Sequence, residues 1–193
     1  GLFGGGQIHH GSKAIVEPDD LKNQKVRMGG PIQKRLLEDL GAVAVAGPGP
    51  KAYELLESGV VDASLHTIES VINFRVEDKL KYHTIVPGGF YDASFFIAIN
   101  EGKWNKLSEA DRKAVQEAAQ QAATEEITRA RAGISAGDDA LLKEIEANGV
   151  AVVRLTDAER DAFRTATAGV YKEWAEKIGA DLVKQAEEDI AKR

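Results

Sequence analysis

The sequence has no cysteine, a single methionine, five prolines and few aromatic residues, which make up 6% of its 193 residues. Without cysteine the chain cannot form a disulfide, use a thiolate nucleophile or bind zinc through sulfur. It also lacks any run of the ~18 apolar residues that a membrane-spanning helix needs. Acidic residues outnumber lysine and arginine by 31 to 25, and the formal net charge of -6 argues against a nucleic-acid-binding surface. The composition, 43% hydrophobic and 29% charged, is that of a globular protein with one domain or two small lobes.

Short strands and short helices alternate over the first half of the chain. The patterns predict strands at 25–28, 42–46, 60–62, 82–86 and 93–100, and helices at 31–40, 51–58 and 67–74. Strand, helix, strand is the unit of a parallel sheet, so the predicted fold class is α/β. Residues 1–11 are glycine-rich and show no periodic spacing of apolar residues, so we assign neither strand nor helix to them.

One predicted helix of unusual length dominates the second half. Between Ser108 and Asn148 apolar residues recur at nearly every third or fourth position, which is the stripe of an amphipathic helix. At ~1.5 Å per residue a continuous helix would be ~60 Å long, more than a small lobe needs, and Gly133 and Gly137 are the expected bend. A last strand at 150–155 and further helices complete the chain.

The sequence from Gly133 to Gly137 matches the G-x-S-x-G motif of hydrolases. That motif needs a strained turn between a strand and a helix, with a histidine later in the chain. Here both flanks are predicted to be helical and no histidine follows Ser135, so a bent helix is the better interpretation. The four histidines lack metal-site spacing, and the glycine clusters form neither G-x-G-x-x-G nor a P-loop. The sequence therefore predicts no catalytic residue, no metal and no cofactor.

Arg27 is the strongest candidate for a binding residue. It lies near the end of the predicted strand at 25–28, just before two glycines and Pro31, which suits the first turn of a helix. The unpaired N–H groups and the positive dipole end of that helix favour an anion, and a guanidinium matches a carboxylate with two parallel hydrogen bonds. The residues alone leave two interpretations open: a site for an organic anion, or an ordinary ion pair with a nearby aspartate or glutamate.

His66 is the second candidate. It follows the predicted strand at 60–62, and ligands of open α/β sheets bind beyond the carboxyl ends of strands. A polar loop residue without a binding role is the alternative.

Several stretches resemble the DctP-type solute-binding subunits of TRAP transporters, the tripartite ATP-independent periplasmic carriers. Four stretches between Glu17 and Ala119 match family motifs in order and spacing: "EPDDLKNQKVRM", "LGAVAV", "AYELLESGVVDAS" and "WNKLSEADRKAVQEAA". Each motif is weak alone, but the four together are specific.

The resemblance implies a type II periplasmic-binding-protein fold, in which two lobes close on a solute and one very long helix runs across both. This chain would then be a fragment of such a protein. Residues 1–92 and 134–193 would form the second lobe with a central mixed sheet, and residues 93–133 would supply a strand and a helix to the first lobe. A signal peptide and the rest of the first lobe are expected upstream of Gly1.

The resemblance also implies a function. The protein would be a periplasmic, non-enzymatic carrier that binds a small organic acid and delivers it to membrane permease subunits. Arg27 falls on the family's carboxylate-binding arginine and His66 on a polar position of the site. Ala63 and Leu65 depart from the family pattern around His66.

The remaining expectations on the site also come from the resemblance. Some members have an aromatic wall residue near the position of Gly49, so a differently shaped pocket is expected here. Phe90 and Asp92 are further candidate ligand-binding residues. Gln7 and Asp92 lie near positions where some members hold a metal with a 2-oxo acid, but the match is too loose to predict a metal.

Two other functions remain open. One is a ligand-binding sensor module of the same fold, and the other is an enzyme acting on an organic acid. We also expect self-association through the apolar segment Ser94 to Ile99, because a strand that lacks its sheet tends to pair with another chain.

Overall fold

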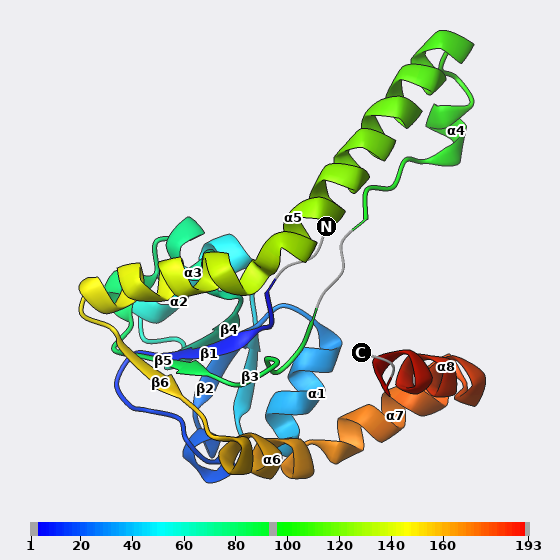
Figure 1. The fold of residues 1–193 in the computed structure, drawn as a ribbon. Helices are drawn as coiled ribbons and strands as arrows, with labels where there is room; N and C mark the ends of the chain where they lie inside the picture. The colour runs from blue at the N-terminus through cyan, green and yellow to red at the C-terminus, as the bar shows by residue number, and fades with distance from the viewer. Residues whose placement is uncertain (1–3, 93–95, 192–193) are drawn as a thin grey trace.

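The computed structural model describes residues 4–92 and 96–191, of which 129–138, 190 and 191 are described by their backbone alone. A sheet with helices on both faces forms the body of the molecule, and a helical arm projects from it (Figure 1). The predicted α/β class is therefore confirmed.

The sheet has six strands in the order β3-β2-β4-β1-β5-β6. Strand β1 runs antiparallel to its neighbours β4 and β5, whereas β2 is parallel to β3 and β4, and β5 is parallel to β6. The sheet is mixed, as predicted. The strands are β1 (Gln7–His10), β2 (Lys25–Met28), β3 (Val43–Ala46), β4 (Ala63–His66), β5 (Tyr82–Ile85) and β6 (Ala151–Arg154).

Eight α-helices and three short 3-10 helices lie between and after the strands of the described chain. The α-helices are α1 (Pro31–Asp39), α2 (Ala52–Glu57), α3 (Ile68–Asn73), α4 (Glu101–Trp104), α5 (Glu109–Ala147), α6 (Asp157–Ala166), α7 (Ala168–Ile178) and α8 (Ala180–Ala191). The 3-10 helices are η1 (Pro18–Leu21), η2 (Gly49–Lys51) and η3 (Glu77–Lys79).

Each face of the sheet is covered by its own set of helices and has its own apolar core. On one face, Leu37 of α1 and Phe163 of α6 pack with Val26 and Leu65 of the sheet. On the other face, α2, α3 and the C-terminal part of α5 enclose a second core (Figure 1). Because alternate residues of a strand point to opposite faces, the side chains of Val26 and Arg27 belong to different faces.

The central strand β1 was not predicted. We assigned residues 1–11 to no element, but Gln7–His10 is a strand whose four residues are all buried. A strand buried on both faces shows no alternation of polar and apolar residues, and Gln-Ile-His-His has no apolar run either. Hydrophobic periodicity therefore cannot identify it.

Two predicted strands differ from the structure. The strand predicted at 60–62 is wrong, because the buried strand is Ala63–His66. Gly59, with a φ of +67°, ends the turn after α2, and the chain needs Val61 and Asp62 to reach the sheet. The strand predicted at 93–100 is wrong for 96–100, which form no strand, while 93–95 lie outside the described residues.

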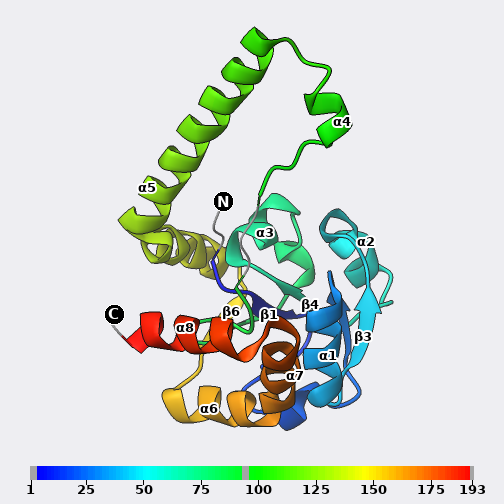
Figure 2. The same cartoon turned by 90° about the vertical axis from the view of Figure 1, so that its right-hand side faces the viewer.

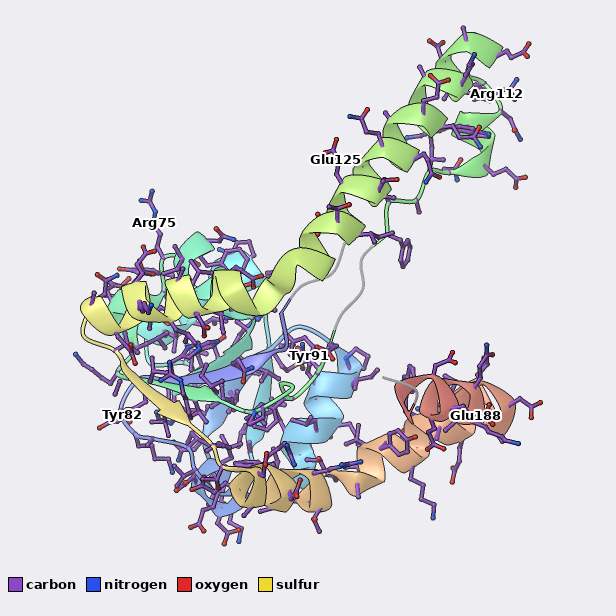
Figure 3. The ribbon with its side chains drawn as sticks, viewed as in Figure 1. Arg75, Tyr82, Tyr91, Arg112, Glu125 and Glu188 are labelled. Atoms are coloured by element: carbon purple, nitrogen blue, oxygen red, sulfur yellow. The ribbon has the colours of Figure 1, made fainter. Side chains whose placement is uncertain are left out.

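The long predicted helix is confirmed as α5, which runs without interruption for 39 residues. Ser108 caps its first turn by accepting a hydrogen bond from the Asp111 N–H. The helix axis changes direction past Glu125, so that one half packs on the body and the other half, with α4, forms the arm (Figures 1 and 3). The G-x-S-x-G motif lies inside this helix, and the nucleophile-elbow interpretation has no strand-to-helix turn to support it. Among the described helices, none combines the length and apolarity needed to cross a membrane.

Replacing Thr156 with alanine is expected to lower the free energy of unfolding by about 1 kcal/mol, because it removes a capping box. Thr156 Oγ1 accepts from the Glu159 N–H at 3.3 Å, and the Glu159 carboxylate accepts from the Thr156 N–H at 2.7 Å. Urea denaturation followed by circular dichroism measures the change. Thr165→Ala, in the same helix but exposed and bonded only to the Asp161 carbonyl, is the matched control and should change stability by less than about 0.5 kcal/mol.

Candidate ligand-binding site

The carboxyl ends of the parallel strands β2, β3 and β4 and the first turn of α1 meet at one edge of the sheet. In Figure 2 this edge faces the arm. An open hollow of about 710 Å³ lies there, lined by Arg27, Met28, Gly29, Gly30, Pro31, Lys34, Ala46, Gly47, Pro48 and Gly49.

Arg27 is held at this edge by two backbone carbonyls. Its Nε donates to the Gly47 oxygen at 2.8 Å and its Nη1 donates to the Leu65 oxygen at 3.2 Å. The residue is 5% exposed, and burial lowers the pKa of its guanidinium. Nη2 takes part in neither bond and lies over Gly29, at 3.2 Å from the position of a Cβ there. The guanidinium is therefore held through Nε and Nη1, while Nη2 faces the hollow.

No aspartate or glutamate of the described chain forms an ion pair with Arg27. The ion-pair interpretation of Arg27 thus finds no partner among the side chains that the structure describes, which exclude those of 129–138, 190 and 191. A buried charge without a counter-charge is costly, and an anionic ligand would relieve that cost.

Two residues that the sequence analysis missed lie beside Arg27. Gln33 of α1 accepts from the Gly29 N–H at 2.6 Å and also hydrogen-bonds the Tyr91 hydroxyl. The ring of Tyr91 lies directly against Gly6, where a side chain would not fit. Burial raises the pKa of Tyr91, and the charge of Arg27 acts in the opposite direction. Tyr91 lies between the predicted candidates Phe90 and Asp92, but the local sequence gives no sign that Tyr91 is the one beside Arg27.

His66 is the last residue of β4 and is 4% exposed. Its Nδ1 lies 3.0 Å from the Ser64 hydroxyl oxygen, and its ring packs against Phe74 with centroids 5.5 Å apart. Burial, and then the nearby charge of Arg27, lower its pKa to about 2. His66 is therefore neutral, and its Nε2 is a buried atom without a hydrogen-bond partner in the described chain.

A row of polar side chains continues from Arg27 across the sheet. Cross-strand pairing sets Arg27 beside Ser64, Ser64 beside His9, and His9 beside His83, all on the face covered by α2 and α3. The rings of His9 and His83 are 4.1 Å apart between centroids and contact each other through their Nδ1 atoms. Four adjacent strands thus carry one buried polar row that starts at the hollow.

The hydrogen bonds of this row define the protons on its imidazoles. His9 Nε2 lies 3.2 Å from the backbone oxygen of His66, which can only accept, so Nε2 carries the hydrogen. Burial lowers the pKa of His9 to about 4, so the ring is neutral and its Nδ1 is an acceptor. The hydrogen between the two Nδ1 atoms therefore belongs to His83, whose Nε2 is left as a buried acceptor without a partner in the described chain.

The other predicted site residues lie in different surroundings. Gly49 lines the hollow. Phe90 instead packs edge-on against Phe163, at 5.3 Å between centroids, in the core of the opposite face. Asp92 is exposed. The amide of Gln7 bonds the backbone of Val86 through both its oxygen and its nitrogen.

Within the described residues, no three histidine, cysteine or acidic side chains come together in a way that could hold a metal ion. The residues at the edge of the sheet are a fixed cation, neutral hydrogen-bonding groups and aromatic rings. This combination suits a small organic anion.

Comparison with known proteins identifies the family of the chain. The family model described as "Bacterial extracellular solute-binding protein, family 7", or DctP, matches residues 3–177. The C4-dicarboxylate-binding periplasmic protein DctP of Rhodobacter capsulatus is 24% identical over 182 residues, which are 93% of this chain and 53% of that protein.

Solved structures of related proteins show the same fold. A TRAP periplasmic solute-binding protein from Ralstonia eutropha H16 with bound (S)-2-acetolactate is 36% identical, with a TM-score of 0.86 over 100% of this chain and 62% of that one. A TRAP protein from Bordetella bronchiseptica with bound (R)- and (S)-mandelate is 27% identical, with a TM-score of 0.76 over 91% of this chain and 55% of that one. The chain thus spans little more than half the length of these relatives. It belongs to family 7 of the bacterial extracellular solute-binding proteins.

Proposed function

We propose that this chain is the larger part of a periplasmic solute-binding protein of a TRAP transporter, and that it binds a small organic acid through the acid's carboxylate. The observation that supports this best is Arg27, a buried guanidinium that is held by two carbonyls and has no acidic partner in the described chain. His66 supplies a polar contact near the bound acid.

The arrangement of Arg27 favours a carboxylate over other anions. Its two hydrogen bonds to Gly47 and Leu65 orient the planar guanidinium, so that little side-chain freedom is lost on binding. Nη2 has both of its N–H groups free of these two bonds and Nη1 has one, so the end of the guanidinium can still offer a carboxylate two parallel hydrogen bonds. The first turn of α1, which has no side-chain cap on Gly30, adds the positive end of its dipole.

The bound ligands of the relatives support the same ligand class. The Ralstonia protein holds acetolactate and the Bordetella protein holds mandelate, and both molecules are carboxylates. As a solute-binding protein the chain would have a non-enzymatic role. Membrane permease subunits would be the partners that receive the solute.

The arm supports the second part of the proposal, that a first lobe completes the binding cleft. Apolar side chains of the arm segment are exposed, with Phe96 at 88% and Ile97 at 98%. We propose that residues 93–133 belong to a first lobe, whereas 1–92 and 134–193 form the second lobe. Closure of the two lobes would remove the acid from water and strengthen its charged hydrogen bonds.

A titration of the 193-residue chain with small carboxylic acids tests the proposal. We expect millimolar acetolactate, lactate and benzoate to shift the amide resonances of residues 27–30 and 47–49, and the same acids to raise the melting temperature of the two-lobed receptor. The methyl esters, which lack the negative charge, are the matched control. Equal responses to acid and ester, or none to any acid, would refute carboxylate binding.

We expect the chain on its own to self-associate, because Phe96 and Ile97 expose apolar surface that has no partner among the described residues. Size-exclusion chromatography with light scattering should show species larger than the 20.8 kDa monomer. A Phe96→Ser/Ile97→Ser variant should shift the population toward monomer, whereas Leu182→Ser, at an exposed residue of α8, should not. A wild-type chain that elutes as a clean monomer contradicts this expectation.

A further inference from the structure

We propose that Phe74 determines the size of the acid that the site accepts, because its ring contacts both His66 and Gly49, and Gly49 lines the Arg27 hollow. The inference rests on the proposed carboxylate site. It assigns to Phe74 a role that follows from its contacts.

The first contact is with Gly49. A Cβ built on Gly49 would lie 2.7 and 2.8 Å from the ring atoms Cε2 and Cζ of Phe74, closer than real side chains approach each other. A side chain at Gly49 would therefore have to displace the Phe74 ring, whereas the backbone does not need glycine there, since its φ is not in the left-handed region. Gly49 also lines the hollow beside Arg27. The ring of Phe74 is therefore separated from the space in which the acid would lie by a residue without a side chain, Gly49.

The second contact is with His66. The two rings are 5.5 Å apart between centroids and inclined by 54°. The Nε2 of His66 is buried and has no hydrogen-bond partner in the described chain. A buried polar atom without a partner is costly, so a ligand group that hydrogen-bonds it gains affinity. The Phe74 ring thus contacts the His66 imidazole as well as Gly49.

Phe74 lies at the end of a short helix, next to a residue with unusual backbone geometry. Phe74 follows α3, a helix of six residues, and precedes Arg75, a non-glycine residue with a φ of +52°. Val76 next to it is fully buried in the second core, whereas Phe74 is only partly buried. Phe74 also packs against that core, so its ring is held by the core, by Gly49 and by His66.

These contacts predict a change of preference when the ring is removed. Phe74→Ala opens a space between Gly49 and His66 that extends the hollow toward the unpaired Nε2. A bulky 2-hydroxy acid can place its ring in that space and its hydroxyl near the imidazole. We therefore infer that the native site favours small acids and that the variant favours large ones.

The test compares two 2-hydroxy acids that differ in bulk, acetolactate and mandelate, by titration of the chain and of the two-lobed receptor. We expect Phe74→Ala to raise the affinity for mandelate relative to acetolactate at least tenfold, and Phe74→Leu, which keeps part of the apolar volume, to raise it less. An unchanged ratio would overturn the inference. If both acids bind in an Arg27-dependent manner and only the ratio stays constant, carboxylate binding stands and the role of Phe74 falls.

A second measurement examines the geometry without any ligand. Gly49→Ala forces the Phe74 ring away, so the ring-current shift of the His66 imidazole protons should change in the wild-type background. In the Phe74→Ala background the same substitution should leave those protons nearly unchanged. Equal changes in both backgrounds would show that the ring does not bridge Gly49 and His66, and would overturn the inference even if both acids bind.

Discussion

The free energy of unfolding is expected to fall steeply as the pH drops from 6.5 to 5, because imidazoles that are neutral in the folded chain become protonated when it unfolds. Burial lowers the pKa of His9 from 6.5 to about 4 and that of His66 to about 2, and it also lowers the pKa of His83. Between these values and 6.5 the unfolded chain binds more protons than the folded one, so stability rises with pH and is fully present above 6.5. It is progressively lost below 6.5.

The expected size of this effect is large for a protein of this length. Each histidine with a strongly lowered pKa contributes about 1.4 kcal/mol per pH unit, or about 2 kcal/mol between pH 6.5 and 5. The three together amount to about 6 kcal/mol, comparable to the whole stability of many domains. Few carboxylates titrate in this interval, so the histidines dominate the slope there.

Urea denaturation at pH 5, 5.5, 6, 6.5 and 7.5, followed by circular dichroism, measures the slope. His83→Gln removes one titrating group and should reduce the slope by about a third. Imidazole resonances recorded at pH 5.5 provide an independent measurement, since His9, His66 and His83 should remain neutral while the chain is folded. A stability that is constant from pH 5 to 7.5, or a protonated His9 in the folded chain at pH 5.5, would contradict the expectation.

Arg27→Lys should weaken the binding of small carboxylic acids by about tenfold to a hundredfold, although the positive charge is kept. A hydrogen bond to a charged group contributes about 1.5–3 kcal/mol, and lysine cannot offer two parallel N–H groups in a plane. Lysine also cannot keep the pair of bonds to the Gly47 and Leu65 carbonyls while it faces the hollow. The ammonium would be less well oriented toward the ligand.

Calorimetry and amide titration of the chain measure this loss. The matched control is Arg164→Lys, an exposed residue of α6 on the other side of the sheet, and its affinity should equal that of the wild type. Circular dichroism shows whether the Arg27 variant keeps its fold. A folded Arg27→Lys protein that binds acids within twofold of the wild type would remove Arg27 from the site.

Local sequence patterns were sufficient for the elements whose residues lie close together in the chain. The strand and helix around Arg27, the neighbouring strand β3 and the helices α2 and α3 follow from apolar spacing and from Pro31, Gly41 and Gly59 at their ends. The length of α5 also follows from its spacing. These helices and strands depend on contacts within one or two helical turns, or on one buried face of the element.

The central strand and the histidine row could not be predicted in this way. His9 and His83 are 74 residues apart and meet only because β1 enters the sheet antiparallel between β4 and β5. Their polar side chains lack the pattern of a buried strand, and no metal-site spacing links them. The contact between Phe74 and Gly49 likewise joins a helix end to a distant loop.

The sequence by itself determined the α/β class, the long helix and the placement of Arg27 at the carboxyl end of a strand, because these depend on local propensity and periodicity. Only the tertiary structure decided that Arg27 has two carbonyl partners and no acidic one in the described chain, and that His66 is buried under Phe74. These contacts form because strands far apart in the sequence pair with one another. The free energy of that pairing comes from packing between distant segments, which no short stretch of sequence can show.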